Sequence, residues 1–75
     1  MTLRAARLGQ TYCITAVQAP EAPRRHLAAL GFEEGARVTC LLAAPRGDPV
    51  AFGVRGAVVA LRKSQLQALT VREAE

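Results

Sequence analysis

Few side chains in this sequence could do chemistry. It contains one histidine, His26, and two cysteines, Cys13 and Cys40. The cysteines form neither a CxxC pair nor a Cys/His cluster with the spacing of a zinc site. We expect both to be free thiols that pack as small hydrophobic side chains. His26 follows two arginines, and we expect it to be solvated rather than to act as a base or a metal ligand.

The carboxylates give no catalytic pattern either. Glu33 and Glu34 are adjacent, so they predict a solvated turn rather than a facing acid and base. Asp48 lies between Gly47 and Pro49, in a turn where a carboxylate typically accepts backbone N–H groups. The glycines match neither GxGxxG nor GxxxxGK[ST], the loops that hold phosphates. We therefore expect a protein that is not an enzyme, with no catalytic residues, no cofactor and no metal ligands.

Length and charge narrow the class of protein. A chain of 75 residues forms one domain, residues 1–75, because so small a body cannot divide into two cores. Ten basic and six acidic residues give a net charge of +4. Such a surface could bind nucleic acid, approach anionic lipid or an acidic protein face, or simply keep the domain soluble. The three aromatic residues are too few for the stacking platform of a single-strand binder, so no nucleic acid is expected.

The sequence also predicts where the protein resides. It has no stretch of about 20 apolar residues that could span a bilayer. Residues 1–10 lack the apolar core of a secretory signal. We expect a cytoplasmic protein that does not insert into the membrane.

One helix is expected to interrupt a series of strands. Residues 11–17 are rich in β-branched and aromatic side chains, which strands favour. Two prolines then break the strand, and residues 24–30 are predicted to form the helix. Gly31 should end it in the left-handed conformation, with Phe32 folding back onto Leu27 in a Schellman motif.

Two hairpins are predicted after the helix. Residues 37–43 form the first strand, and 44–47 form a turn with proline second and glycine fourth, as type I turns favour. Residues 50–54 and 57–61 alternate apolar and small or polar side chains, which indicates strands with one buried face. The side chains expected to face inward from these strands are Val38, Cys40, Leu42, Val50, Phe52, Val54, Val59 and Leu61.

The C-terminal part completes an all-β fold. Ser64 should cap a short helical turn that runs through Leu69. Thr70 and Val71 remain as a brief closing strand. About five short strands, with one short helix after the first and a helical turn near the C-terminus, predict a small, strongly bent barrel. Closing the sheet would remove its exposed edges.

The order of these signals resembles the FeoA family, the accessory proteins of bacterial ferrous iron uptake. The resemblance runs from about residue 3 to residue 71 and includes Leu8-Gly9. Its most specific parts are the APxGDP turn and the ALR segment. The matching residues are Arg25-x-Leu27-x-x-Leu30-Gly31-Phe32-x-x-Gly35-x-x-Val38, Ala44-Pro45-Arg46-Gly47-Asp48-Pro49-Val50, Val54-Arg55-Gly56 and Ala60-Leu61-Arg62.

The resemblance implies an SH3-like barrel that acts in the cytoplasm, recruited to the inner face of the membrane by its partner. That partner would be the cytosolic G-protein region of FeoB, the ferrous iron permease. Ferrous iron would be the cargo of FeoB and not a cofactor of this chain. Among the residues expected to contact the partner are Arg24, Arg25, Leu27 and Ala28, since arginines suit an acidic protein face. Leu27 is also expected in the core, and the arginines could serve solubility alone.

Two other functions stay open. Metal-dependent repressors carry a similar SH3-like domain at their C-termini, where it acts as a regulatory module. That interpretation predicts a DNA-binding segment ahead of the barrel. A small basic barrel could instead bind RNA, and its affinity would then fall steeply with salt.

Overall fold

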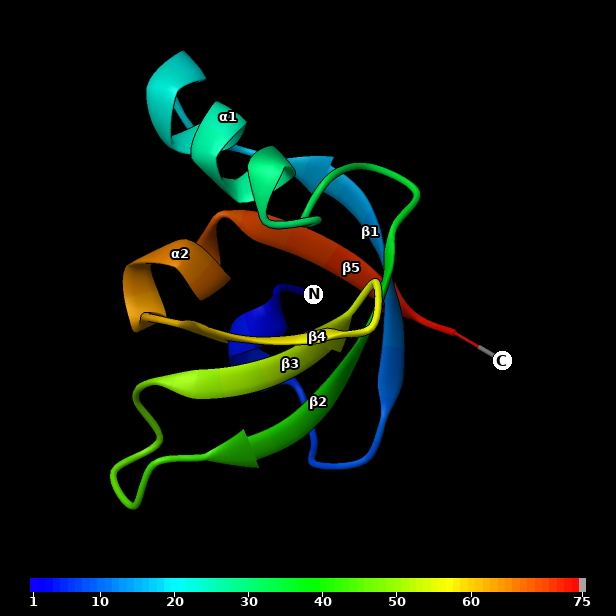
Figure 1. Ribbon diagram of the computed structural model, residues 1–75, viewed down its shortest axis with the longest axis vertical. Helices are drawn as coiled ribbons and strands as arrows, with labels where there is room; N and C mark the ends of the chain where they lie inside the picture. The colour runs from blue at the N-terminus through cyan, green and yellow to red at the C-terminus, as the bar shows by residue number, and fades with distance from the viewer. Residues whose placement is uncertain (75) are drawn as a thin grey trace.

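The computed structural model describes residues 1–74 and shows a single antiparallel sheet of five strands, strongly bent (Figure 1). The strands lie in the order β4-β3-β2-β1-β5. Two short helices and one 3-10 turn accompany the sheet. This confirms the predicted all-β, SH3-like fold class. The strands are β1 (Thr11–Val17), β2 (Arg37–Ala43), β3 (Val50–Val54), β4 (Ala57–Leu61) and β5 (Leu69–Glu73).

The sequence led us to expect a sheet that closes on itself, but the hydrogen-bonded sheet stays open. Within residues 1–74, β4 and β5 are the two outer strands and do not pair with each other. The 3-10 turn η1 (Leu3–Ala5) and helix α2 (Lys63–Gln67) contact one another, and both contact β5. Leu3 and Leu66 are buried in these two elements and belong to the core. Side-chain packing therefore completes the barrel where the hydrogen-bonded ladder ends.

Helix α1 (Glu21–Ala29) begins three residues earlier than predicted. The N–H of Arg24 donates to the carbonyl of Pro20 at 3.0 Å, which closes the first helical turn. Pro23 is tolerated inside that turn because the first N–H groups of a helix have no partner within it. The predicted Schellman motif is confirmed: the N–H groups of Phe32 and Gly31 donate to the carbonyls of Leu27 and Ala28 at 2.8 and 2.9 Å.

The prediction that Leu42 faces inward with Val38 and Cys40 is wrong. The register between β2 and β3 shifts between Cys40 and Leu42, which is a β-bulge. Alternation fails after the bulge, and Leu42 is 59% exposed. A bulge depends on the pairing of two strands, so the alternation within one strand could not have revealed it.

The turn and the cap that follow are partly as predicted. The N–H of Gly47 donates to the carbonyl of Ala44 at 2.7 Å, which confirms the turn, and the Asp48–Pro49 peptide bond is cis. The predicted Ser64 cap is wrong, because α2 begins at Lys63. The N–H of Lys63 donates instead to Asp48 Oδ1 at 3.1 Å. The N–H of Arg62, the residue before the helix, donates to Gln65 Oε1 at 2.8 Å, so a distant carboxylate and a local amide together hold the start of α2.

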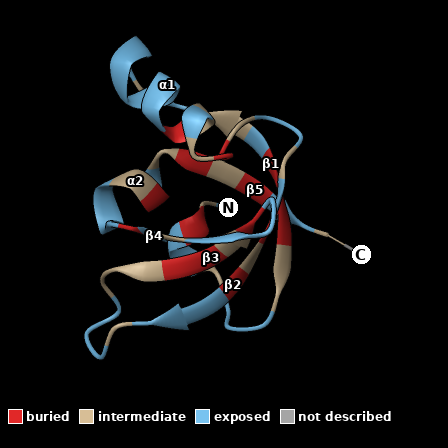
Figure 2. Ribbon diagram, viewed as in Figure 1, coloured by how far each residue is buried: buried red, intermediate tan, exposed pale blue. Residues whose placement is uncertain are grey.

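The closing strand is longer than predicted. It spans Leu69–Glu73 rather than Thr70 and Val71, so Leu69 belongs to β5 and not to the helical turn. Strand β5 pairs with β1 from Val17↔Leu69 to Tyr12↔Glu73. Burial is concentrated on the concave side of the sheet and beneath the helices (Figure 2). The core consists of Leu3, Tyr12, Ile14, Leu27, Phe32, Val38, Cys40, Phe52, Val54, Leu61, Leu66, Leu69 and Val71.

Candidate partner-binding surface

Helix α1 stands off the sheet and presents most of its surface to solvent (Figures 1 and 2). Of its nine residues, Leu27 is the buried one, at 2% exposure. Arg24 and Arg25 are exposed, and Ala28 is half-buried. Of the four residues predicted to meet a partner, two therefore lie open on the helix. Leu27 instead anchors the helix in the core, as its position opposite Phe32 had suggested.

Arg24 and Ala28 both line one depression in the surface, with a volume of about 270 Å³. Its other lining residues come from β1 and from the segment after α1: Val17, Phe32, Glu33 and Glu34. The sequence placed the two glutamates in a solvated turn. Glu34 is exposed, and Glu33 accepts a hydrogen bond from the guanidinium of Arg55, with which it forms an ion pair. Both side chains of this pair remain largely exposed, so we expect it to contribute little stability.

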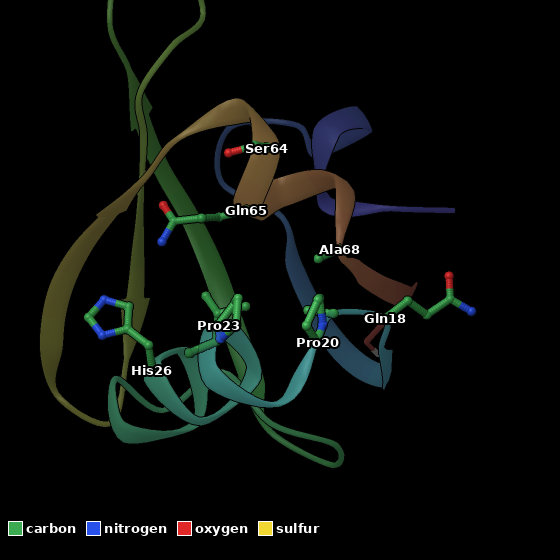
Figure 3. A pocket seen from close by; sticks show the side chains of 9 residues that line it. Gln18, Pro20, Pro23, His26, Ser64, Gln65 and Ala68 are labelled. Atoms are coloured by element: carbon green, nitrogen blue, oxygen red, sulfur yellow. The ribbon is translucent and has the colours of Figure 1, made fainter.

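A second, larger groove of about 320 Å³ lies between α1 and α2 (Figure 3). In the figure, His26 reaches from α1 toward the side of the groove that Gln65 approaches from α2. Sequence reasoning missed this groove, because its two walls are about 40 positions apart and no local pattern joins them. The lining residues are Gln18, Ala19, Pro20, Pro23, His26, Leu27, Ser64, Gln65 and Ala68.

The two cysteines are free and buried, as predicted. Burial raises the pKa of the Cys40 thiol above its ordinary value, because the apolar surroundings disfavour the thiolate. Among residues 1–74, no three His, Cys, Asp or Glu side chains gather where they could hold a metal ion. No helix in the described part of the chain has the length and apolar character needed to cross a membrane.

The bent five-stranded sheet, with its helix inserted between β1 and β2, defines a small SH3-like domain. Comparison with known proteins then identifies the family. The model of the FeoA domain matches residues 1–73, so this chain belongs to the FeoA family. A search of curated proteins finds no match.

Solved structures agree with this assignment. The FeoA protein of Chlorobium tepidum is 32% identical with a TM-score of 0.91, and the match covers all of this chain and 71% of that one. A Stenotrophomonas maltophilia FeoA complexed with zinc is 32% identical with a TM-score of 0.82, and the match covers 96% of this chain and 89% of that one. That protein is described as a prokaryotic SH3 domain protein and suggested to be a ferrous iron transport activating factor.

The fold also occurs inside larger proteins. A manganese-dependent transcriptional repressor matches 99% of this chain with a TM-score of 0.86, at 23% identity. This chain corresponds to 41% of the repressor's length. At that identity the likeness shows a shared fold and nothing about a shared activity.

Proposed function

We propose that this chain is an accessory protein of bacterial ferrous iron uptake that acts by binding the cytosolic G-protein region of a FeoB-like permease. Membership of the FeoA family and the suggested role of the Stenotrophomonas relative support the ferrous iron setting. The observation that carries the binding role is the exposed helix α1, held by a single buried leucine between two grooves. The protein would work in the cytoplasm, at the inner face of the membrane.

Helix α1 is suited to docking because its attachment leaves its outer side free. Leu27 and the Schellman motif fix the C-terminal end of the helix to the core. Arg24 and Arg25 are then presented on a rigid element, where a guanidinium can bind carboxylates in a bidentate manner. The grooves on either side could accept apolar side chains around those charges, which is the usual arrangement of an interface.

Isothermal titration calorimetry against the soluble G-protein region of the permease, with and without nucleotide, tests this proposal. We expect the double variant Arg24→Glu/Arg25→Glu to lower the affinity by about 10- to 100-fold, because two favourable charge contacts become repulsive. Its melting temperature should stay within about 2 °C of the native value, since exposed charges contribute little to stability.

The matched control is Arg4→Glu/Arg72→Glu. It changes the net charge by the same amount, at two exposed residues that lie outside α1. Equal losses in the two double variants would show only a general charge effect and would exclude α1 as the site. If the native protein fails to bind the G-protein region in any nucleotide state, the partner itself is wrong.

The structure disfavours the RNA-binding alternative. Single-strand binders stack bases on exposed aromatic rings. Here Tyr12 is 1% exposed, and Phe32 and Phe52 are 0% exposed, with the two phenylalanine rings packed edge to face. The aromatic side chains of this chain therefore serve the core.

A further inference from the structure

The outer, convex face of strands β2, β3 and β4 carries side chains that the function proposed above does not use. Residues paired across neighbouring strands point to the same side of a sheet. Gly53 pairs with Val58, and Ala51 pairs with Ala60, while Phe52 between them is buried on the inner side. The two pairs therefore lie on the outer face.

The β-bulge adds both leucines of β2 to this face. Leu41 packs over Gly53, with its Cδ1 3.4 Å from the point where a Cβ on Gly53 would lie. Leu42 pairs with Ala51 after the register shift. Without the bulge, these two consecutive leucines would point to opposite faces of the sheet. We call the resulting group the outer apolar patch; it consists of Leu41, Leu42, Ala51, Gly53, Val58 and Ala60.

The outer apolar patch is open to solvent at its largest side chains. Leu41, Leu42 and Val58 are 42%, 59% and 68% exposed. Single exposed leucines are common on proteins, but a contiguous apolar area on three strands is often an interaction site. The patch reaches β4, an outer strand of the sheet, and the five residues of β4 carry no charge or proline to discourage contact.

The excess positive charge of the protein belongs to the segment that forms this patch. Residues 37–63 form the three strands, their turns and the start of α2, and contain five basic residues and one acidic residue. The remainder of the chain contains five of each sign, so the whole net charge of +4 belongs to this segment. The one acid, Asp48, already accepts the Lys63 N–H, and Arg55 is paired with Glu33. The patch is thus aliphatic and belongs to the cationic segment of the chain.

We propose that the outer apolar patch binds the surface of an anionic phospholipid bilayer. The exposed leucines and valine would enter the outermost acyl region, while Arg46, Arg62 and Lys63 contact lipid phosphates. All three cations are exposed: Arg46 lies in the turn between β2 and β3, Arg62 directly follows β4, and Lys63 begins α2. Binding of this kind needs no membrane-spanning segment.

Other occupants fit these observations less well. A second copy of the chain would bring two equally cationic segments together, which is repulsive. An acidic protein would suit the cations, but protein interfaces carry about one hydrogen bond per 100–200 Å². The side chains of the patch offer no donor or acceptor, and the hydroxyl of Thr39, which pairs with Gly53 on the same face, is already bonded to that of Thr11 at 2.8 Å. An aliphatic patch on a segment that also carries Arg46, Arg62 and Lys63 matches the acyl and phosphate layers of a lipid surface.

Co-sedimentation with vesicles tests the proposal. We expect the native protein to bind vesicles of phosphatidylglycerol and phosphatidylcholine at low salt, and to bind pure phosphatidylcholine at least about tenfold less. Leu42→Thr/Val58→Thr places β-branched side chains, which strands favour, at both positions and should lower binding about tenfold, as should Arg46→Gln/Arg62→Gln. Leu42→Ile/Val58→Ile, which keeps the apolar character, should bind as the native protein does.

Two results would overturn the proposal. One is the absence of binding to anionic vesicles at low salt, which would leave an acidic protein as the occupant of the patch. The other is binding that the threonine variant leaves unchanged, because attraction would then be electrostatic and the patch would have no part in it. Arg4→Gln/Arg72→Gln removes the same charge elsewhere and should have less than about a twofold effect. Either result would leave the proposed binding of the permease by α1 untouched, since that interaction uses Arg24 and Arg25 and none of the residues of the outer apolar patch.

Discussion

Replacing Gly31 by alanine should destabilise this protein more than the same change at its other turn glycines. Gly31 is buried at the end of α1 with φ of +104°, a conformation that L-residues avoid. A Cβ there would lie 2.7 Å from Cγ2 of Val54, inside the core. The substitution therefore combines backbone strain with a steric clash.

The two costs can be estimated separately. A left-handed conformation costs an alanine about 1–2 kcal/mol relative to glycine. Forcing an extra methyl group into a packed core costs about 1–3 kcal/mol more. We therefore expect Gly31→Ala to lower the free energy of unfolding by about 2–5 kcal/mol, which is a large part of the stability of so small a domain.

Gly35→Ala is the matched control. Gly35 has φ of +86°, but no atom lies within 4 Å of the position of its Cβ. It should show the conformational cost alone, about 1–2 kcal/mol. In urea denaturation followed by circular dichroism, Gly31→Ala should be the less stable variant by about 1–3 kcal/mol. In thermal denaturation this corresponds to a further decrease in Tm of about 5–20 °C.

Equal destabilisation by the two substitutions would refute the reasoning, because the contact with Val54 would then have no energetic consequence. The double variant Gly31→Ala/Val54→Ala provides a second check. Removing the Cγ atoms of Val54 removes the clash, so the double variant should be more stable than the sum of the single changes predicts, by about 1 kcal/mol or more.

Three further predictions concern other parts of the fold. Leu27→Ala should lower the free energy of unfolding by about 2–4 kcal/mol, measured by urea denaturation, because the side chain that holds α1 to the core is lost; a loss below about 1 kcal/mol would mean that α1 is held by other contacts. Asp48→Ala should cost about 1 kcal/mol because the N–H of Lys63 loses its acceptor, whereas Asp48→Asn keeps an oxygen there and should cost less; equal effects would exclude this hydrogen bond as the reason. In a Cys13→Ala background, iodoacetamide at pH 8 should label Cys40 at least about 100-fold more slowly in the folded than in the unfolded protein, because the thiol is 1% exposed and burial raises its pKa. Since the unfolded chain releases that proton at lower pH, stability should also fall as pH rises above the ordinary pKa of a cysteine thiol, and Cys40→Ala should reduce this decrease.

The signals that predicted the fold correctly were local. The helix end at Gly31 and Phe32 was predicted because a glycine followed by a hydrophobic residue favours the Schellman motif wherever it occurs. The turn at residues 44–47 was predicted by the positions of its proline and glycine. Alternation correctly identified Phe52 and Leu61 as core residues. Each of these signals needs only a few neighbouring residues.

The errors came from features that depend on two distant segments. The bulge that exposes Leu42 exists only in the pairing of β2 with β3. The start of α2 is held in part by a carboxylate in another turn, and the 3-10 turn that buries Leu3 packs against α2 and β5. The sequence also could not decide the place of Leu27, which was expected both in the core and at the partner surface. Its burial depends on how α1 packs on the rest of the fold.

The sequence by itself determined the strands, the helix, the capping motif and the scarcity of reactive groups, because backbone preferences and side-chain chemistry act over short distances. It also contained the FeoA pattern that the family comparison bears out. Only the tertiary structure decided which surfaces exist: the groove between α1 and α2, and the apolar patch on the segment that carries the protein's excess positive charge. Surfaces of this kind are made where remote segments meet, and the register of the strands sets which side chains meet there.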